Sequence, residues 1–438
     1  MAAADREPPG SQAAQPLTRA VDVNAASKRD GAALSGDFGL RVWKLAVQPG
    51  APHWIANAGR AKPIDSNDAP HWWAARLPSP PGSRAMIKVC GLSLYGVAAA
   101  STRYRLEQYV AGLREFGVEL DIVPLLSNEY IKRTYAGQKY RVLEIARDYA
   151  ARAAFLLEQK RYDLAIVQAE LFPFLPGGFE SRLLRIPYVY DFDDAFFLKY
   201  RLERFKTVSF FLKNKFDPVV ARAAAVFAGN RHLQDYALQR NPRTILLPTV
   251  VDTDRYVHAP RKTAGVFTVG WIGSPTTSVY LRELAAPLAQ LGAEGPVRFL
   301  VVGGKCAPID NVEVVNLPWE HATEVDEING FDVGVMPLFD DPWARGKCAL
   351  KLIQYMACGV PVVASPVGAN LDVATQDCGF LAGDPAAWAE RLRALRDDAA
   401  LRSTMGAAAL RRVEAQYSLR SALPIMAATL RSAARPRG

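Results

Sequence analysis

The sequence predicts an α/β protein in which two doubly wound parallel sheets face each other across a cleft. Short apolar runs suited to buried strands alternate with segments of helical spacing, which is the pattern of parallel sheets covered by helices. The alternation runs through one series, restarts near residue 260, and is too long in total for a single sheet. Ligands of such sheets bind beyond the carboxyl ends of the strands, so two facing sheets enclose a binding cleft.

The first series starts at Met86, where "MIKVCGLSL" predicts a buried strand. "STRYRLEQYVAGLREFG" has helical spacing, with Leu106, Val110 and Leu113 on one face. Further strands are expected at "VELDIVPLL", "YDLAIVQAE", "IPYVYDFDD", "AAAVFAGN" and "RTILLPTVVD". We therefore expect a first domain over 86–258.

The second series predicts a domain over 259–415, joined to the first by a hinge at 250–262. Its strands are expected at "VFTVGWIG", "VRFLVVGGK", "VEVVNLP", "FDVGVMPL" and "VPVVASPVG", and its helices at "SVYLRELAAPLAQLG" and "ALKLIQYMACG". Residues 416–438 are expected to form a closing helix and tail. Residues 1–85 lack any sustained period and are expected to be an irregular extension, so that the functional protein begins after it.

Composition is that of an ordinary globular protein, with 50% apolar and 22% charged residues among 438. The five cysteines form no C-x-x-C pair, which favours a reducing cytoplasmic location. Neither a long uncharged apolar run nor a signal-peptide pattern is found, so no transmembrane helix is expected. The net charge of +9 fits an anionic partner such as a nucleotide or a lipid surface. No nucleic-acid partner and no zinc site are expected.

The most informative stretch is 332–370, in which a strand leads through a loop into a helix expected to start near Lys347. A helix N-terminus offers unpaired N–H groups and a positive dipole end, where phosphates bind readily. Lys347 and Lys351 are four residues apart and lie on one helix face, where their charges repel each other. A diphosphate between them would relieve this repulsion. Two solvated lysines at a helix start are the alternative.

The stretch "MACGVPVVASPVGAN", with "VDTDRY", "RFLVVGGK" and the closing "AQYSLRSALPIMAATLR", resembles the GT-B glycosyltransferases, especially the large retaining group that uses nucleotide-diphosphate sugars. The resemblance covers roughly 86–436. It implies two Rossmann-like domains, an acceptor in the first, a nucleotide-sugar donor in the second, and no metal or other cofactor.

For the donor, the resemblance and the motif together point to Gly273, Ser274, Leu317, Arg345, Gly346, Lys347, Lys351 and Gln354. The family has two glutamates, which correspond here to Gly346 and Gln354. An amide at 354 can still bond the ribose hydroxyls. The loop "GWIGSPTTS" lacks the family's basic pair, so we expect the two lysines to hold the diphosphate with help from loop N–H groups, and the base to lie near Leu317.

The first domain is expected to hold the acceptor. Gly96, Arg103 and Arg105 lie at a strand-to-helix turn, where the resemblance suggests acceptor contact or closure over the diphosphate. An ordinary capped helix with exposed arginines is the alternative.

Three aspartates follow a strand in "VYDFDDAFF". We expect Asp191 to bind the acceptor, and the carboxylates of Asp193 and Asp194 to act in catalysis by orienting the acceptor hydroxyl or stabilising positive charge on the sugar. Lys351 is expected to act in catalysis through the leaving diphosphate. Helix capping remains an alternative. The D-x-D spacing also matches the metal site of a different fold, GT-A, but the two-domain pattern argues against it.

Residues 196–216 carry six Lys/Arg, one Glu and seven aromatics. This segment is expected either to contact an anionic membrane or a lipid-linked acceptor, or to be a partly buried helix with a basic outer face. The whole pattern predicts retaining transfer of a sugar from a nucleoside-diphosphate sugar to a glycan or lipid-linked glycan. A catalytically silent nucleotide- or sugar-binding protein is the alternative, because both family glutamates are replaced.

Overall fold

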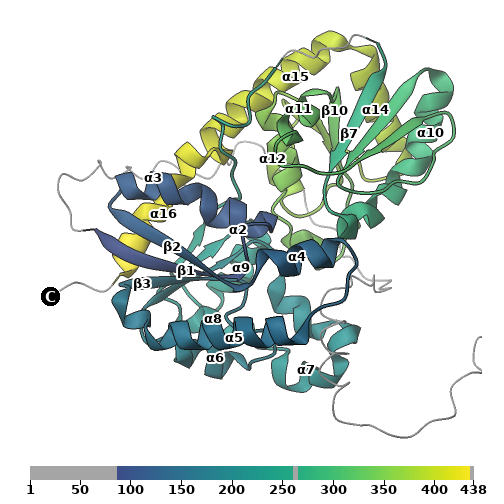
Figure 1. Cartoon of the computed structure of the whole chain (residues 1–438). Helices are drawn as coiled ribbons and strands as arrows, with labels where there is room; N and C mark the ends of the chain where they lie inside the picture. Colours follow the sequence, from purple (N-terminus) through teal and green to yellow (C-terminus); the bar gives the residue numbers. More distant parts are fainter. Residues whose placement is uncertain (1–85, 260–264, 435–438) are drawn as a thin grey trace, which may run out of the picture.

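The computed structural model describes residues 86–259 and 265–434 (Figure 1). The expectations about the extension 1–85, and about the part of the hinge at 260–262, lie outside the described residues.

The first domain is a six-stranded parallel sheet with the strand order β2-β1-β3-β4-β5-β6. Its strands are β1 (Ile87–Tyr95), β2 (Val118–Leu126), β3 (Leu164–Gln168), β4 (Tyr188–Phe192), β5 (Ala225–Ala228) and β6 (Thr244–Leu246). Its α-helices are α2 (Ala100–Arg105), α3 (Val110–Glu115), α4 (Asn128–Tyr135), α5 (Val142–Leu157), α6 (Gly177–Leu183), α7 (Lys206–Leu212), α8 (Phe216–Arg222) and α9 (Arg231–Leu238). Short 3₁₀ segments are η2 (Glu107–Tyr109), η3 (Gln159–Arg161), η4 (Phe196–Arg201) and η5 (Glu203–Phe205).

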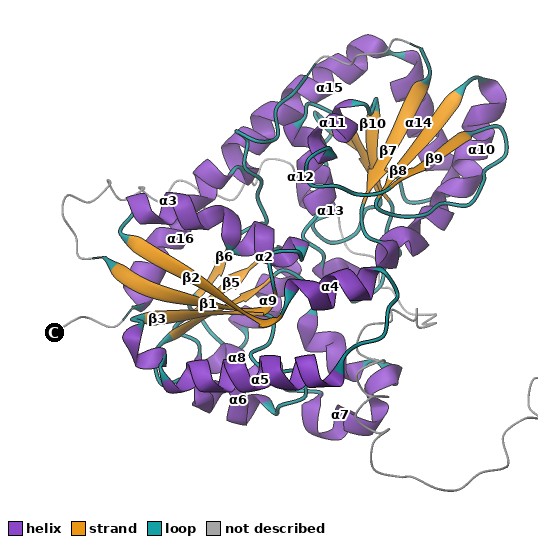
Figure 2. Cartoon of the chain, viewed as in Figure 1, coloured by secondary structure: helices purple, strands orange, loops and turns teal. Residues whose placement is uncertain are grey.

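The second domain is also a six-stranded parallel sheet, with the order β12-β11-β10-β7-β8-β9. Its strands are β7 (Phe267–Ile272), β8 (Val297–Val302), β9 (Glu313–Leu317), β10 (Val333–Met336), β11 (Val362–Ala364) and β12 (Gly379–Leu381). Its helical segments are η6 (Pro275–Leu284), α10 (Ala285–Glu294), α11 (Glu324–Asn329), η7 (Ala344–Gly346), α12 (Leu350–Ala357), α13 (Asn370–Val373), α14 (Pro385–Asp397), α15 (Ala399–Arg412) and the π-turn η8 (Val413–Tyr417). Helices flank both sheets (Figure 2), which confirms the predicted pair of doubly wound parallel sheets.

The last helix, α16 (Leu419–Ala433), returns to the first domain and lies along α3 (Figure 1). Its buried residues Met426 and Leu430 belong to the same apolar cluster as Val89 at the start of the chain's first strand. A Cβ at Gly112 of α3 would come within 2.5 Å of Leu423, so glycine allows the two helices to approach closely. The described part of the chain therefore begins and ends in the first domain.

The single helix expected after the first strand is divided in three. Leu106 leaves the helical region, with φ −130° and ψ −57°, so α2 ends there and η2 and α3 follow as separate segments. The side chain of Gln108 donates to the carbonyl oxygens of Tyr104 and Val250, at 2.6 Å and 3.0 Å, which fixes the break against the interdomain connection. Tertiary contacts override the local helical spacing here.

Within the described residues, no helix is both long enough and apolar enough to cross a lipid bilayer.

Candidate active site between the two domains

The carboxyl ends of β4, β7 and β10 are brought together where the two domains meet. The Lys347 ammonium lies 3.6 Å from the Asp194 carboxylate, and the Cys348 thiol donates to the carbonyl oxygen of Asp193 at 3.1 Å. From the first domain, the Asn230 amide donates to the carbonyl oxygen of Lys347 at 3.0 Å. The loop before α12 therefore contacts the loop after β4. Both loops follow the carboxyl ends of strands, which is where the sequence predicted a ligand to bind.

Helix α12 begins at Leu350, later than the sequence suggested. The residue before it, Ala349, adopts a left-handed conformation with φ 53°, and this turn separates Lys347 from the helix. Lys347 therefore belongs to the preceding loop, whereas Lys351 is in the first helical turn. The two side chains do not form the i, i+4 pair that their spacing predicted.

Lys351 lies against the loop that follows β7. A Cβ at Gly273 would come within 2.9 Å of Lys351 Cε, and the ammonium is 5.3 Å from the centre of the Trp271 ring. Within residues 86–259 and 265–434, this ammonium has no hydrogen-bond or ion-pair partner. Burial, and then the charge of nearby Lys347, lower the pKa of Lys351 from 10.5 to about 7. The site therefore contains an uncompensated cation that an anion would stabilise.

Lys347 has a different electrostatic environment from that of Lys351. Burial would lower the pKa of Lys347, but the facing carboxylate of Asp194 outweighs this and raises it. Lys347 is therefore protonated and paired, and part of its charge is already neutralised by the first domain.

Asp193 can exchange a proton near neutral pH. Burial raises the pKa of Asp193 from 3.8 to about 7, and the carboxylates of Asp191 and Asp194 add to the effect while Arg105 opposes it. A carboxyl group with such a pKa at the contact between the domains has the chemical properties needed to orient or deprotonate a hydroxyl.

Gln354 is held in a buried polar network that joins the domains. Its amide nitrogen, which carries two N–H groups, lies within hydrogen-bond distance of three oxygens: Glu324 at 2.6 Å, the Tyr256 hydroxyl at 2.8 Å and the Tyr104 hydroxyl at 3.0 Å. Arg255 in turn donates to Glu324 at 2.8 Å. Gln354 is only 4% exposed, so its amide nitrogen is engaged by protein groups in this conformation.

The sequence analysis did not identify Glu324, Tyr104 or Tyr256 as partners of Gln354. All three lie far from Gln354 in the chain, so the spacing of residues gives no signal for them.

The expectation that Arg105 and Asp191 contact the acceptor needs correction. Their side chains are 1% and 0% exposed and form a bidentate ion pair with each other. Arg105 also donates to the carbonyl oxygen of Leu247 at 2.8 Å. The pair ties α2 to β4 and to the segment after β6, inside the first domain rather than in the cleft.

The two other residues assigned to the acceptor lie in different settings. A side chain at Gly96 would overlap the Asn128 amide, so its glycine serves close packing. The Arg103 guanidinium donates to the carbonyl oxygen of Ala98 at 2.8 Å and lies 4.8 Å from the centre of the Trp319 ring in the second domain. Arg103 is therefore the residue of this group whose side chain contacts the second domain.

The other residues that the sequence assigned to the donor lie in the loop before α12 and in the loop after β7. Arg345 forms a bidentate pair with Asp340, at 2.7 Å and 3.0 Å, with both side chains about half exposed. A Cβ at Gly346 would approach the backbone nitrogen of Ala195 to 2.7 Å, so this glycine allows direct contact between the domains. Ser274 caps η6 through the hydroxyl and backbone of residue 277.

Leu317 ends β9, and its carbonyl oxygen accepts from Gly303 N at 2.8 Å. Gly303 has φ 78°, and a Cβ there would meet the side chain of Trp319. The backbone at Gly303 and Leu317, near which the base of the donor was expected, therefore packs closely against the loop of Gly273.

Among the residues that the structure describes, no group of three or more His, Cys, Asp and Glu side chains could hold a metal ion. The carboxylate of Asp191, the first aspartate of the D-x-D sequence, is buried and forms an ion pair with Arg105. Sugar transfer without a metal stays a prediction.

Residues 265–398 match the family model of the Glycosyl transferases group 1. The protein has the GT-B fold of the glycosyltransferases. This GT-B chain superimposes on the UDP and glucose complex of Anabaena HepE with a TM-score of 0.58, 16% identity and coverage of 79% of this chain and 100% of the other. Sucrose-phosphate synthase of Thermosynechococcus elongatus gives a TM-score of 0.57, 17% identity and coverage of 79% and 98%. The predicted resemblance to the GT-B glycosyltransferases is confirmed, whereas the retaining mechanism stays a prediction.

A sequence relative of the GT-B chain is the D-inositol 3-phosphate glycosyltransferase of Kineococcus radiotolerans, which is 27% identical over 229 residues. The match covers 43% of this chain and 51% of the relative, so the chain matches about half the length of that protein.

Proposed function

We propose that the protein transfers a sugar from a nucleoside-diphosphate sugar to a hydroxyl acceptor. The unpartnered, largely buried ammonium of Lys351, beside the paired Lys347, carries the proposal. A buried cation without a counter-ion is costly to the folded protein, and a bound diphosphate would supply the missing charge. The N-terminal turn of α12 adds N–H groups with a favourable dipole.

The donor is proposed to be a UDP-sugar. Anabaena HepE, whose fold this chain shares, has been crystallised with UDP and with UDP-glucose. In our proposal the diphosphate lies between Lys351 and the loop of Gly273 and Ser274, while the base lies against the backbone near Leu317. The networked Gln354 would have to exchange one of its protein partners to reach the ribose.

Transfer is proposed to retain the anomeric configuration, with a glycan or lipid-linked glycan as acceptor. Lys351 would stabilise the charge that develops on the leaving diphosphate, an interaction that strengthens in the transition state. Asp193, which exchanges its proton near neutral pH, would orient the acceptor hydroxyl, while Asp194 keeps Lys347 in place. A cytoplasmic location remains a prediction.

The test is a donor screen followed by a transfer assay. Thermal unfolding with a panel of nucleoside-diphosphate sugars should reveal stabilisation by the UDP-sugars but not by uridine. Release of UDP should then depend on an added acceptor and fall in the Lys351→Ala protein. Stabilisation without UDP release from any acceptor would favour the silent binding protein, and no stabilisation by any nucleotide would reject the proposed donor site.

A further inference from the structure

Helix α7 presents two adjacent phenylalanines to solvent. Phe210 is 78% exposed and Phe211 is 74% exposed, and their rings meet edge to face with centroids 5.0 Å apart. We call this pair the phenylalanine tip. Isolated exposed apolar residues are common, but two large neighbouring rings with this exposure indicate an interaction surface.

The other aromatics of the segment are buried or partly buried. Tyr200, Phe205 and Phe216 are at most 2% exposed, Leu212 at the end of α7 is 3% exposed, and Phe196 and Phe197 pack against the same core. Most of the apolar surface of 196–216 is therefore buried in the first domain, as the alternative of a partly buried segment with a basic outer face requires. Contact of the segment with a membrane stays a prediction, and it would involve the exposed rings of the tip.

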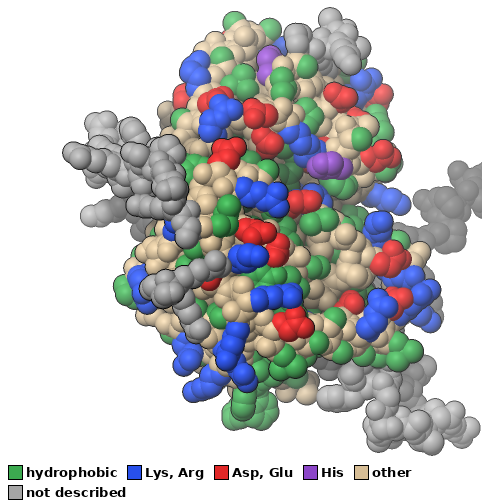
Figure 3. Space-filling view, turned by 60° about the vertical axis from the view of Figure 1, so that its left-hand side comes forward, with side chains coloured by type: hydrophobic (Ala, Val, Ile, Leu, Met, Phe, Trp, Pro, Cys, Tyr) green, Lys and Arg blue, Asp and Glu red, His purple; other side chains and the backbone are tan. Residues whose placement is uncertain are grey.

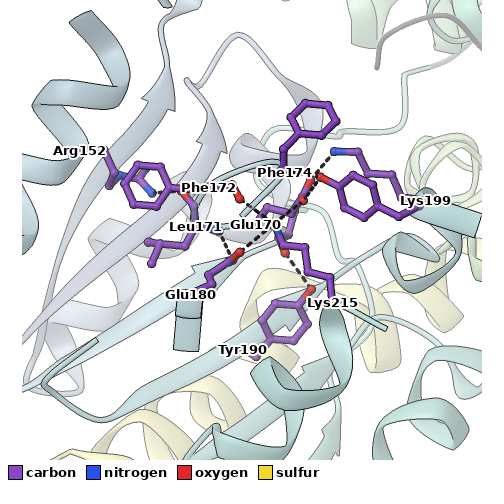
Figure 4. Close-up of polar contacts among 11 residues, drawn as sticks. Arg152, Glu170, Leu171, Phe172, Phe174, Glu180, Tyr190, Lys199 and Lys215 are labelled. Carbon is purple, nitrogen blue, oxygen red and sulfur yellow. Dashed lines mark hydrogen bonds and ion pairs between the residues drawn. The ribbon is translucent and has the colours of Figure 1, made fainter. Parts of the chain in front are cut away.

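A buried charge cluster anchors the segment on both sides of the tip (Figure 4). Lys199 of η4 pairs with Glu170, which follows β3, and Lys215 before α8 lies 2.8 Å from both Glu170 and Glu180. Burial would raise the pKa of Glu170, but the two ammonium groups outweigh it and lower that pKa to about 2. The cluster is thus an internal ion network that fixes the base of α7, and its two lysines do not contribute to the surface.

The charges left around the tip are mainly basic. Arg201, Lys206 and Lys213 are exposed, whereas the acidic neighbour is Glu203, which lies 3.9 Å from the Lys206 ammonium. Figure 3 shows apolar side chains protruding at the lower end of the molecule beside lysine and arginine side chains. Protruding aromatics within a basic surface are complementary to a bilayer that carries anionic headgroups.

Helix α6 adds to the same end of the domain (Figure 1). Its first residue, Gly177, packs on the backbone of Lys215 just beyond α7, and two residues later Phe179 is 70% exposed. Arg182 on this helix is also exposed. The aromatic and basic character therefore continues beyond α7.

We propose that the phenylalanine tip docks the protein on an anionic lipid bilayer, with the rings in the headgroup region and Arg201, Lys206 and Lys213 against the anionic headgroups. The tip's segment starts directly after Asp194, whose carboxylate pairs with Lys347 in the cleft. A docked protein would therefore have its cleft connected to the membrane surface by one short, anchored segment. The docking does not depend on the proposed sugar transfer.

The test is co-sedimentation of the full chain with phosphatidylcholine vesicles that do or do not contain phosphatidylglycerol. The unmodified protein should bind the phosphatidylglycerol vesicles, and added salt should weaken this binding. The Phe210→Ser/Phe211→Ser protein should bind at least about tenfold more weakly, because the rings no longer bury apolar area in the lipid. Lys206→Glu/Lys213→Glu should lose roughly tenfold or more, through the headgroup charge.

A matched control is Val279→Ser/Leu371→Ser, which removes apolar side chains that are 42% and 53% exposed on the second domain. This protein should bind vesicles like the unmodified chain. The proposal is overturned if the unmodified protein binds neither vesicle, if the tip variant binds equally well, or if the tip variant only dissociates a dimer in gel filtration. UDP binding, measured on the same variants, should be unchanged, so a failure of docking is distinguishable from a failure of the donor site.

Discussion

Replacing Lys351 by methionine should stabilise the protein without ligand and weaken its binding of UDP. In the folded chain, burial and the nearby Lys347 lower the pKa of Lys351 from 10.5 to about 7. This difference corresponds to at most about 5 kcal/mol against the charged form. Because the ammonium still meets some water, we expect a gain of about 1–3 kcal/mol in the free energy of unfolding near neutral pH. Methionine keeps an unbranched, flexible side chain, one heavy atom shorter than that of lysine, and removes the charged group.

The sign of the effect can be tested with pH. Since the folded pKa of Lys351 lies below its unfolded value, the unfolded chain binds more protons between about pH 7 and pH 10.5. The unmodified protein therefore gains stability from this group as pH rises through that window. The advantage of Lys351→Met should be full at and below pH 7 and should vanish toward pH 10.5, as measured by urea unfolding at a series of pH values.

UDP binding should change in the opposite direction. A lost charge-assisted contact costs about 1.5–3 kcal/mol, which is roughly a tenfold to hundredfold weaker affinity. Calorimetric titration with UDP should show this loss, while binding of uridine, which lacks phosphate, should hardly change. Lys160→Met, at an exposed position of η3, is the control and should behave like the unmodified protein. Unchanged UDP affinity in Lys351→Met, or lower stability at pH 7, would refute the reasoning.

Three further substitutions test other parts of the site. Gln354→Glu should lower the melting temperature, at a cost of about 1–3 kcal/mol, because it places a second carboxylate beside Glu324; a melting temperature like that of the unmodified protein would contradict the network. Arg105→Met should cost about 3–5 kcal/mol in urea unfolding, since it leaves Asp191 buried without its partner; a cost below about 1 kcal/mol would place the pair nearer to solvent than the structure has it. Gly346→Ala should slow sugar transfer while barely changing thermal stability, because the added methyl prevents close approach of the domains; full activity would show that this contact is not needed in the reaction.

Much of the fold is predictable from local pattern. Each strand such as "VFTVGWIG" is a short apolar run between turn residues, and burial on both faces of a parallel sheet requires such a run wherever the rest of the chain lies. The restart near residue 260 separates the two sheets for the same reason. The division of the first helix at Leu106 was not predictable, since it depends on contacts with a segment more than 140 residues away.

The candidate site was predictable as a region but not in its pairings. The motif places Lys347, Lys351 and Gln354 near one strand end, and this follows from chain order alone. It does not say that Asp194 neutralises one lysine while the other stays unpaired, nor that Gln354 bonds a tyrosine 250 residues earlier. These partners come from the other domain.

The sequence by itself determined the two-sheet architecture and the region where Lys347, Lys351 and Gln354 lie, but not the residue at which α12 begins. These depend on hydrophobic periodicity and chain order, which are local properties. Only the tertiary structure decided which charged groups remain available for a ligand, withdrawing Arg105 and Asp191 into the core and leaving Lys351 without a partner. The physical reason is that the energy of a charge depends on the water and the counter-charges within a few ångströms, and folding brings these from distant parts of the chain.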